Sequence, residues 1–450
     1  MREATPIRTW PRRRIAGPAV AAVAAVSLLA LGLGSPASAI LPAAAPVGPA
    51  GDVLPPLSDA GPRPNADAVA AALQGPLLDP ALGGSVGAVV IDVATGTVVY
   101  AQDAATPRSA ASTQKVLTAV AVLDALGPEH RIATTASWDP ATSTITLVGA
   151  GDPSLSSVAA EGSSLAALAD EVAANVPPGA VSLVYDTTLF DGPELAPSWP
   201  SSYPAAGVAA PVTALIVDRA RIAGSEQREE DPALIAAQMF AGMLAERGFT
   251  VNDVRPGLTS GQVVASTESF PLAAIVAQML TDSDNDASEM LAHLAGAART
   301  GTGSFQTGAQ ATLATLDALG LDTAGMDVVD GSGLSYEDTV SPQLMASLLA
   351  LLADESSPEW GWPVVLGLPV AGLTGTLDDR FLTADTFVGA GRVRAKTGTL
   401  DGVAALSGTV VDADGQLLVF ALMSDAATDV YAARDALDRA AASLAACGCT

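Results

Sequence analysis

The order of predicted strands and helices is the feature that most limits the folds open to this 450-residue chain. Residues 86–92 and 98–100 flank a Gly-containing turn and are typical of a strand hairpin. Strands are also predicted near the other end, over residues 392–397, 404–411 and 417–423. Apolar residues at helical spacing fill much of the interval between them. This order predicts an α+β domain that is closed by the two ends of the chain, with an insertion in its middle.

The first 39 residues are typical of an export signal. Five Arg residues precede an apolar run over residues 15–33, and Ala37-Ser38-Ala39 offers small side chains at a cleavage site. We expect cleavage after Ala39 and an exported protein, extracellular or in the cell envelope. A retained membrane anchor is the alternative, because the apolar run approaches the length of a spanning helix. Residues 40–65 are rich in Pro, Ala and Gly and are predicted to be a linker.

The charge balance excludes one class of partner and singles out two residues. The chain has 48 acidic and 21 basic side chains, and its net charge of −27 is unsuited to binding nucleic acid. Two of the basic residues, Lys115 and Lys396, are lysines and the rest are arginines. Lys differs most from Arg where an amine must lose its proton or act as a compact point charge. Both positions are therefore candidate functional sites.

Cysteine and histidine are too few to predict a metal site. Cys447 and Cys449 are separated by one residue, and outside the cell such a pair is more often oxidised than free. A metal would need about four soft ligands, and the two histidines, His130 and His293, are interpreted as surface or packing residues. We predict no metal and no cofactor.

Ser112 and Lys115 open the first long predicted helix, over residues 112–126. Residues at i and i+3 share one face of a helix, so the two side chains can meet. Serine is a weak nucleophile until a base takes its proton, and Lys can be that base only when it is neutral, which burial favours. The alternative is a Ser that caps the helix beside a solvated Lys. The near absence of lysine elsewhere favours a nucleophile and its base.

Ser283-Asp284-Asn285 lies between two predicted helices. The Ser283 hydroxyl could relay a proton, and the Asn285 amide could orient a substrate amide. Taken alone, the segment is better interpreted as a helix-capping turn, since Ser, Asp and Asn are favoured N-caps.

Lys396-Thr397-Gly398-Thr399 ends a predicted strand. Lys396 can attract a carboxylate, and the hydroxyls of Thr397 and Thr399 can donate hydrogen bonds to it. Gly398 lets a substrate strand approach the edge of the sheet, where a backbone N–H can complete an oxyanion hole. The alternative is an ordinary strand end before the turn at residues 401–402.

The three segments together, in this order, are the S-x-x-K, S-D-N and K-T-G motifs of penicillin-binding proteins and class A β-lactamases. With them the sequence resembles the serine penicillin-recognising enzymes. Within these it is most similar to the low-molecular-mass class C penicillin-binding proteins, the D-alanyl-D-alanine carboxypeptidase/endopeptidase family. The resemblance runs from about residue 66 to the C-terminal helix. Five segments carry it: 109–115, 149–155, 185–199, 330–335 and 368–377.

The resemblance implies a β-lactamase/transpeptidase-like fold, in which helices cover an antiparallel sheet. It also implies an inserted α/β domain between the first two motifs. Ser283 follows Ser112 by 171 residues, far more than a β-lactamase places there. Residues 66–130 and 266–450 are therefore predicted to form the catalytic domain, and residues 131–265 the insert.

The implied activity is that of a serine DD-peptidase, which hydrolyses the D-Ala-D-Ala or cross-bridge bond of peptidoglycan stem peptides and is inhibited by β-lactams. Ser112 would be acylated by the penultimate D-Ala carbonyl, with Lys115 as the base. Ser283 would relay the proton to the leaving group, and Asn285 would hold the substrate amide. The terminal carboxylate and the oxyanion would be bound by Lys396, Thr397, Thr399 and the backbone N–H groups of Ser112 and Thr399.

Trp199 and Tyr203 are candidates for lining the pocket of the substrate side chain, because related proteins bring a loop of the insert there. Packing between domains is an equally weighted alternative. No acidic residue stands between Trp199 and Tyr203, where some relatives meet a stem-peptide amine.

Two other functions on this fold each predict a feature that the sequence does not have. A serine β-lactamase would need a carboxylate that activates the deacylating water, usually in an E-x-x-L-N segment, and the sequence has no such segment between the first two motifs. A non-catalytic wall-binding protein would predict eroded motifs, whereas all three are intact. A D-amino-acid amidase or esterase stays open, as do the balance of carboxypeptidase and endopeptidase action and the oligomeric state.

Overall fold

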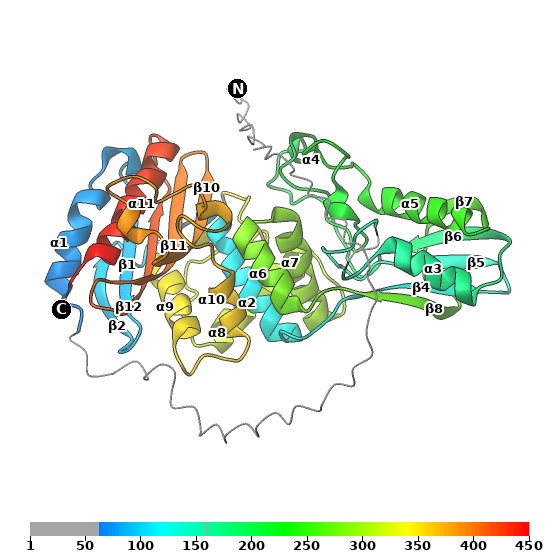
Figure 1. The fold of residues 1–450 in the computed structure, drawn as a ribbon, viewed down its shortest axis with the longest axis horizontal. Helices are drawn as coiled ribbons and strands as arrows, with labels where there is room; N and C mark the ends of the chain where they lie inside the picture. The colour runs from blue at the N-terminus through cyan, green and yellow to red at the C-terminus, as the bar shows by residue number, and fades with distance from the viewer. Residues whose placement is uncertain (1–62, 159–160, 450) are drawn as a thin grey trace, which may run out of the picture. The chain divides into compact units, whose positions relative to one another are not determined.

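The computed structural model describes residues 63–158 and 161–449 (Figure 1). The predicted export signal, its cleavage site and nearly all of the predicted linker lie outside the described residues. Within those ranges, no helix has the length and apolar character needed to cross a membrane.

Five strands form an antiparallel sheet to which both ends of the described chain contribute. Their order is β10-β11-β12-β1-β2, and every neighbouring pair is antiparallel. Val86 of β1 lies opposite Ser424 of β12, so the predicted α+β fold closed by the two chain ends is confirmed. The strands are β1 (Val86–Asp92), β2 (Thr97–Gln102), β10 (Val393–Leu400), β11 (Val403–Val411) and β12 (Leu417–Ser424).

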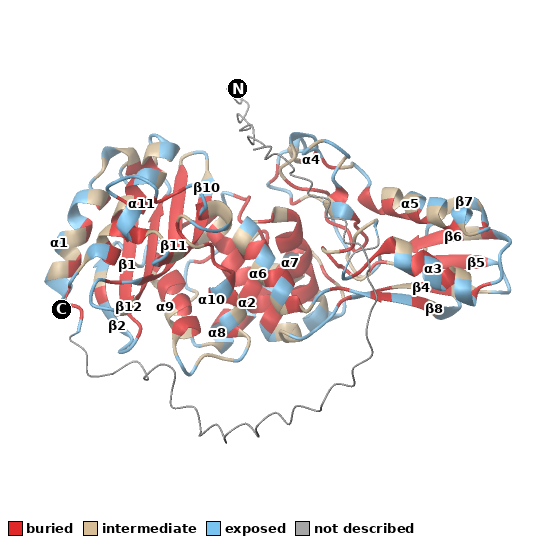
Figure 2. Ribbon diagram, viewed as in Figure 1, coloured by how far each residue is buried: buried red, intermediate tan, exposed pale blue. Residues whose placement is uncertain are grey.

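Helices cover both faces of this sheet, and Figure 2 shows its central strands buried along most of their length. Successive residues of β1 alternate between two hydrophobic cores: Ala88 and Val90 belong to one, Val89 and Ile91 to the other. The first core contains α1 (Ala66–Leu77) and α11 (Val430–Ala446). The helices of the second are α2 (Gln114–Leu126), α6 (Leu272–Asp282), α7 (Asn285–Thr300), α8 (Phe305–Ala318), α9 (Pro342–Ala353) and α10 (Gly361–Gly367).

A second five-stranded sheet lies between α2 and α6 in the sequence. Its order is β7-β6-β5-β4-β8, with β5, β6 and β7 parallel and β4 antiparallel to both of its neighbours. α3 (Leu165–Asn175) and α5 (Pro232–Glu246) pack on it around a third core. The strands are β4 (Ala133–Asp139), β5 (Thr144–Val148), β6 (Ala180–Asp186), β7 (Thr250–Pro256) and β8 (Gln262–Glu268). The domain boundaries at residues 131 and 265 stay a prediction.

Most of the chain between β6 and α5 is irregular. We call residues 187–231 the insert loop; it contains the short helix α4 (Tyr203–Ala206). Residues of this loop contact the first turn of α7, which follows the second motif. The two-residue strands β3 (Arg108–Ser109) and β9 (Thr339–Val340) pair next to the first motif.

Candidate active site

Ser112 lies on a 3-10 turn, Ala111–Thr113, that leads into α2. The sequence predicted that Ser112 starts the helix, but α2 itself begins two residues later, at Gln114. The reason is the preceding residue: Ala111 has a φ of 44°, in the left-handed region that non-glycine residues seldom adopt. Ala111 is completely buried, so its surroundings hold this conformation, while Ser112 remains partly exposed. The strained backbone at Ala111 therefore presents the partly exposed hydroxyl of Ser112 at the N-terminal end of the buried helix α2.

Lys115 is fully buried, and its amino group has three hydrogen-bond partners. Its Nζ lies 3.0 Å from Ser112 Oγ, 2.8 Å from Asn285 Oδ1 and 2.7 Å from the carbonyl oxygen of Ser332. A neutral amine has two N–H groups and one lone pair. Because the Asn285 and Ser332 oxygens can only accept, they orient the two N–H groups and leave the lone pair facing Ser112. The geometry is that of a base beside its nucleophile.

The electrostatics of Lys115 suit the same role. Burial disfavours the charged amine and lowers the pKa of Lys115 to about 8, although the nearby carboxylates of Glu289 and Asp330 act in the opposite direction. A base with this pKa is partly neutral near pH 7, which an exposed lysine is not.

The second motif occupies the junction of two helices. α6 ends at Asp282, Ser283 has a left-handed backbone conformation with φ 56°, and Asp284 caps α7 by accepting a hydrogen bond from Ala287 N at 2.9 Å. The turn is therefore a helix cap, as the segment taken alone predicted. It also carries two polar side chains to the lysines: Asn285 reaches Lys115, and Ser283 Oγ accepts from Lys396 Nζ at 2.8 Å.

The third motif lies on β10, an edge strand of the main sheet. Lys396 is fully buried, and burial lowers its pKa well below the ordinary value, with the charge of Lys115 acting in the same direction. Thr397 shares a hydrogen bond of 2.9 Å with Thr376, and Thr399 is exposed. A side chain on Gly398 would meet the carbonyl oxygen of Ala110 at 3.0 Å, so glycine lets β10 approach the nucleophile turn closely.

The structure thus brings five predicted residues into direct contact across three parts of the chain. Asn285 links to Ser112 through Lys115, and Ser283 links to Lys396. The Trp199 indole, in contrast, is 7% exposed and donates to Asp330 Oδ2 at 2.8 Å, which favours packing over lining an open pocket. The Tyr203 ring lies 5.8 Å from that of Trp199 and is partly exposed.

Sequence reasoning missed the support around Lys115. Glu289 lies one helical turn after Asn285 on α7 and is completely buried; its carboxylate accepts from Gly331 N at 2.9 Å and Ser332 N at 2.7 Å. Burial and the charge of Asp330 raise the pKa of Glu289 to about 8. The i, i+4 spacing from Asn285 was the available signal. Glu289 thereby holds the loop whose Ser332 carbonyl contacts Lys115.

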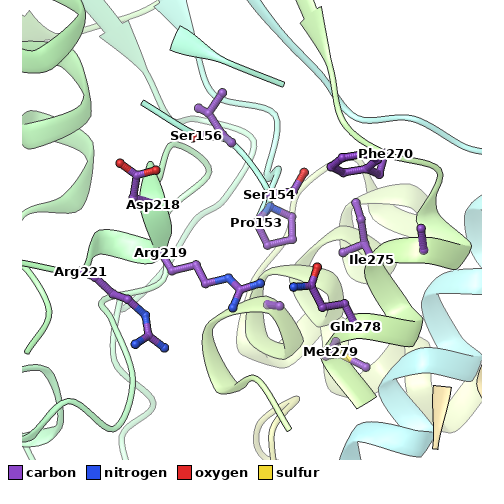
Figure 3. Close-up of a pocket in the computed structure, with 13 residues that line it drawn as sticks. Pro153, Ser154, Ser156, Asp218, Arg219, Arg221, Phe270, Ile275, Gln278 and Met279 are labelled. Carbon is purple, nitrogen blue, oxygen red and sulfur yellow. The ribbon is translucent and has the colours of Figure 1, made fainter. Parts of the chain in front are cut away.

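A cavity of about 620 Å³ lies beside the second motif (Figure 3). Met279 of α6 and Ala287 of α7 line one side of it, and Arg219 and Asp218 of the insert loop line another. Among the described residues that line this cavity, none belongs to the predicted catalytic set. The cavity is therefore distinct from the site around Ser112.

His293 is a packing residue, as expected. Its buried ring lies 5.0 Å from that of Phe190 and 4.7 Å from that of Phe305, and burial lowers its pKa to about 4. His130 is exposed. The part of the chain that the structure describes has no group of three His, Cys, Asp or Glu side chains that could hold a metal ion.

Comparisons with known proteins point to one family. The model of the D-Ala-D-Ala carboxypeptidase 3 (S13) family matches residues 69–230 and 223–445. The chain is 33% identical to carboxypeptidase DacB of Mycolicibacterium smegmatis, over 96% of this chain and 95% of the relative. It is 30% identical to the D-alanyl-D-alanine carboxypeptidase of Actinomadura sp., over 76% of this chain and 78% of the relative.

A solved structure supports the fold. Penicillin binding protein 4 from Haemophilus influenzae superposes with a TM-score of 0.70, over 82% of this chain and 97% of that chain, at 21% sequence identity. At this identity the likeness shows the fold alone, and it agrees with the predicted β-lactamase/transpeptidase-like architecture.

Proposed function

The chain belongs to the D-Ala-D-Ala carboxypeptidase 3 (S13) family, and on that premise we propose that Ser112 is its acylated nucleophile. The predicted class, a low-molecular-mass class C penicillin-binding protein, is confirmed. The chain is a serine-type D-Ala-D-Ala carboxypeptidase, a hydrolase that acts on the cell wall. The single observation that carries the assignment of Ser112 is its contact of 3.0 Å with the amino group of a buried lysine. In the neutral amine, the other two hydrogen bonds of Lys115 would leave the lone pair facing Ser112.

The acyl-transfer step follows from these contacts. Ser112 Oγ attacks the carbonyl carbon of the penultimate D-Ala, and its proton passes to the neutral Lys115. The tetrahedral intermediate collapses when the C–N bond breaks. The proton that Lys115 took from Ser112 returns to the leaving amine through the Ser283 hydroxyl, which gives up its own proton and receives one in exchange. Ser283 can do so because its hydroxyl already accepts from Lys396 and is free to donate on its other side. Water then hydrolyses the ester and restores Ser112.

The third motif is proposed to hold the end of the substrate. A terminal carboxylate beside Lys396 would supply the counter-charge that burial denies this amine, and would return its pKa toward the ordinary range. Thr397 and Thr399 would donate hydrogen bonds to the same group, and the N–H groups of Ser112 and Thr399 would bind the oxyanion. Asn285 would orient the substrate amide and, through its Oδ1, the amino group of Lys115.

The substrate is proposed to be the stem peptide of peptidoglycan, and β-lactams are proposed to acylate the same serine. We also propose that the protein acts outside the membrane after cleavage behind Ala39, and that residues 131–265 form an inserted domain. The bonded pair Cys447–Cys449 supports export, because disulfides persist in oxidising compartments.

The test combines labelling by a fluorescent penicillin with release of D-Ala from a stem pentapeptide. We expect Ser112→Ala to abolish both, while Ser356→Ala, which changes an exposed serine, keeps both. Labelling that survives in Ser112→Ala would disprove the nucleophile assignment. Strong labelling without peptide cleavage would favour a binding role, and rapid turnover of penicillin would favour a β-lactamase.

A further inference from the structure

The second motif is held from outside by the insert loop. Asn285 Nδ2 donates to the carbonyl oxygen of Val208 at 2.9 Å, and the backbone N–H of Ala210 donates to Asp286 Oδ1 at 2.7 Å. Arg228 donates to the other oxygen of Asp286 from Nε at 2.9 Å and from Nη2 at 2.8 Å. Each contact joins the first turn of α7 to residues that lie more than fifty positions earlier in the chain.

A second ion pair acts on the same turn. Arg219 pairs with the buried carboxylate of Asp284, between Ser283 and Asn285. Asp218, Arg219 and Ala220 have consecutive positive φ values of 49°, 56° and 53°, a backbone that non-glycine residues adopt only when their surroundings impose it. Figure 3 shows the Arg219 side chain extended beside Gln278 and Met279 of α6. Both acidic neighbours of Asn285 are thus neutralised by arginines of the insert loop.

These contacts decide how the Asn285 amide faces Lys115. An amide has one accepting oxygen and one donating nitrogen, and a flip exchanges them. Because Val208 offers only an acceptor, it takes the Nδ2 end and leaves Oδ1 toward Lys115 Nζ, at 2.8 Å. A flipped amide would place a donor against the amine and would disturb the direction of its lone pair.

The Arg228–Asp286 pair is better explained by positioning than by stability. Arg228 and Asp286 have side chains only 4% and 2% exposed, and burial raises the pKa of Asp286 against the opposing effect of Arg228. A buried ion pair adds little net stability over apolar residues of the same shape, so its presence beside the motif calls for another reason. Holding the first turn of α7, and with it Asn285, against Val208 is such a reason.

We infer that Arg228, through Asp286, is a positioning residue for acyl transfer, and that the insert loop is in this way a working part of the active site. The inference rests on the proposed role of Asn285 as a partner of Lys115. It assigns no contact with substrate to Arg228, whose effect must pass through the first turn of α7.

A double-mutant cycle in the full-length protein tests the inference. We expect Arg228→Gln and Asn285→Ala each to slow acylation by a fluorescent penicillin at least tenfold. If Arg228 acts through Asn285, the double variant acylates no more slowly than Asn285→Ala alone. Arg221→Gln is the matched control, since this arginine of the same loop forms an exposed pair with Glu226 and should acylate as the wild type does.

Folding is followed in parallel by thermal unfolding. Arg228→Lys keeps a charge beside Asp286, so it should stay folded even if Arg228→Gln does not. Its acylation rate should lie between those of the wild type and Arg228→Gln. If the rate losses of Arg228→Gln and Asn285→Ala multiply in the double variant, the inference is overturned and the proposed function stays intact. The same holds if both Arg228 variants acylate as fast as Arg221→Gln. A normal rate in Asn285→Ala would instead overturn the proposed role of Asn285, and the inference with it.

Discussion

Lys115→Arg separates the two roles that a lysine can have beside a serine, that of a base and that of a cation. Arg keeps the positive charge and the donors, but its pKa lies above 12, so it stays cationic. Lys115 has a pKa of about 8 because burial disfavours its charged form. At pH 8 about half of the wild-type side chains are therefore neutral, compared with fewer than about one in 10,000 arginines. A role as base predicts a severe loss, whereas a role as cation predicts almost none.

We expect acylation of Lys115→Arg by penicillin to slow by about 10²–10⁴-fold, the range that general-base catalysis contributes. The wild type should acylate about tenfold faster for each pH unit gained below 8 and level off above it, since the neutral amine is the reactive form. Stopped-flow labelling between pH 6 and 9 measures both effects, and thermal unfolding checks that the variant is folded.

Lys396→Arg serves as the comparison, because it keeps the charge proposed to bind a carboxylate. Its loss should be milder than that of Lys115→Arg. If a folded Lys115→Arg acylated within tenfold of the wild type, proton transfer to Lys115 would be refuted. A wild-type rate that did not change between pH 6 and 8 would refute it as well.

Two further predictions concern buried carboxylates. Glu289→Gln replaces one of the two oxygens that accept from Gly331 N and Ser332 N with an amide NH2 group, so the loop whose Ser332 carbonyl contacts Lys115 loses an acceptor and the plateau rate of acylation should fall. A plateau equal to that of the wild type would contradict this. Asp438→Asn leaves the buried Arg380 without its counter-ion and should lower the free energy of unfolding, measured in urea, by about 3 kcal/mol. The control Asp435→Asn changes an exposed carboxylate and should stay within about 0.5 kcal/mol of the wild type. Equal losses in the two variants would contradict the ion-pair argument.

The main sheet was predictable because its strands are buried on both faces. Residues 417–423 form a continuous apolar run, and residues 404–411 are apolar except for three small residues in the middle. β11 and β12 begin and end within one residue of these ranges. β7 and β8 were not predicted. Their residues alternate little and are largely exposed, since both strands lie at the edges of their sheet. Edge strands that bury few side chains leave a weak pattern in the sequence.

The motifs were predictable for a different reason: each is local, and their order along the chain is specific. What holds them is not local. Ser332 lies 217 residues from Lys115 and Arg228 lies 58 residues from Asp286, and both are ordinary residues in irregular segments. The strain at Ala111 likewise depends on burial that only the folded chain provides. Sequence patterns thus pointed to the groups proposed to react, and tertiary contacts supply their orientation.

The turn between α6 and α7 also explains why two lysines can share one site. Ser283 contacts Lys396 and Asn285 contacts Lys115, so three residues fix the separation of the two amines. The charge of Lys115 lowers the pKa of Lys396. By the same repulsion, a proton on Lys396 would disfavour a proton on Lys115. A carboxylate that arrives beside Lys396 favours the proton on that side. On the roles proposed for these residues, substrate binding would therefore promote the neutral form of Lys115 at the moment when Ser112 must lose its proton.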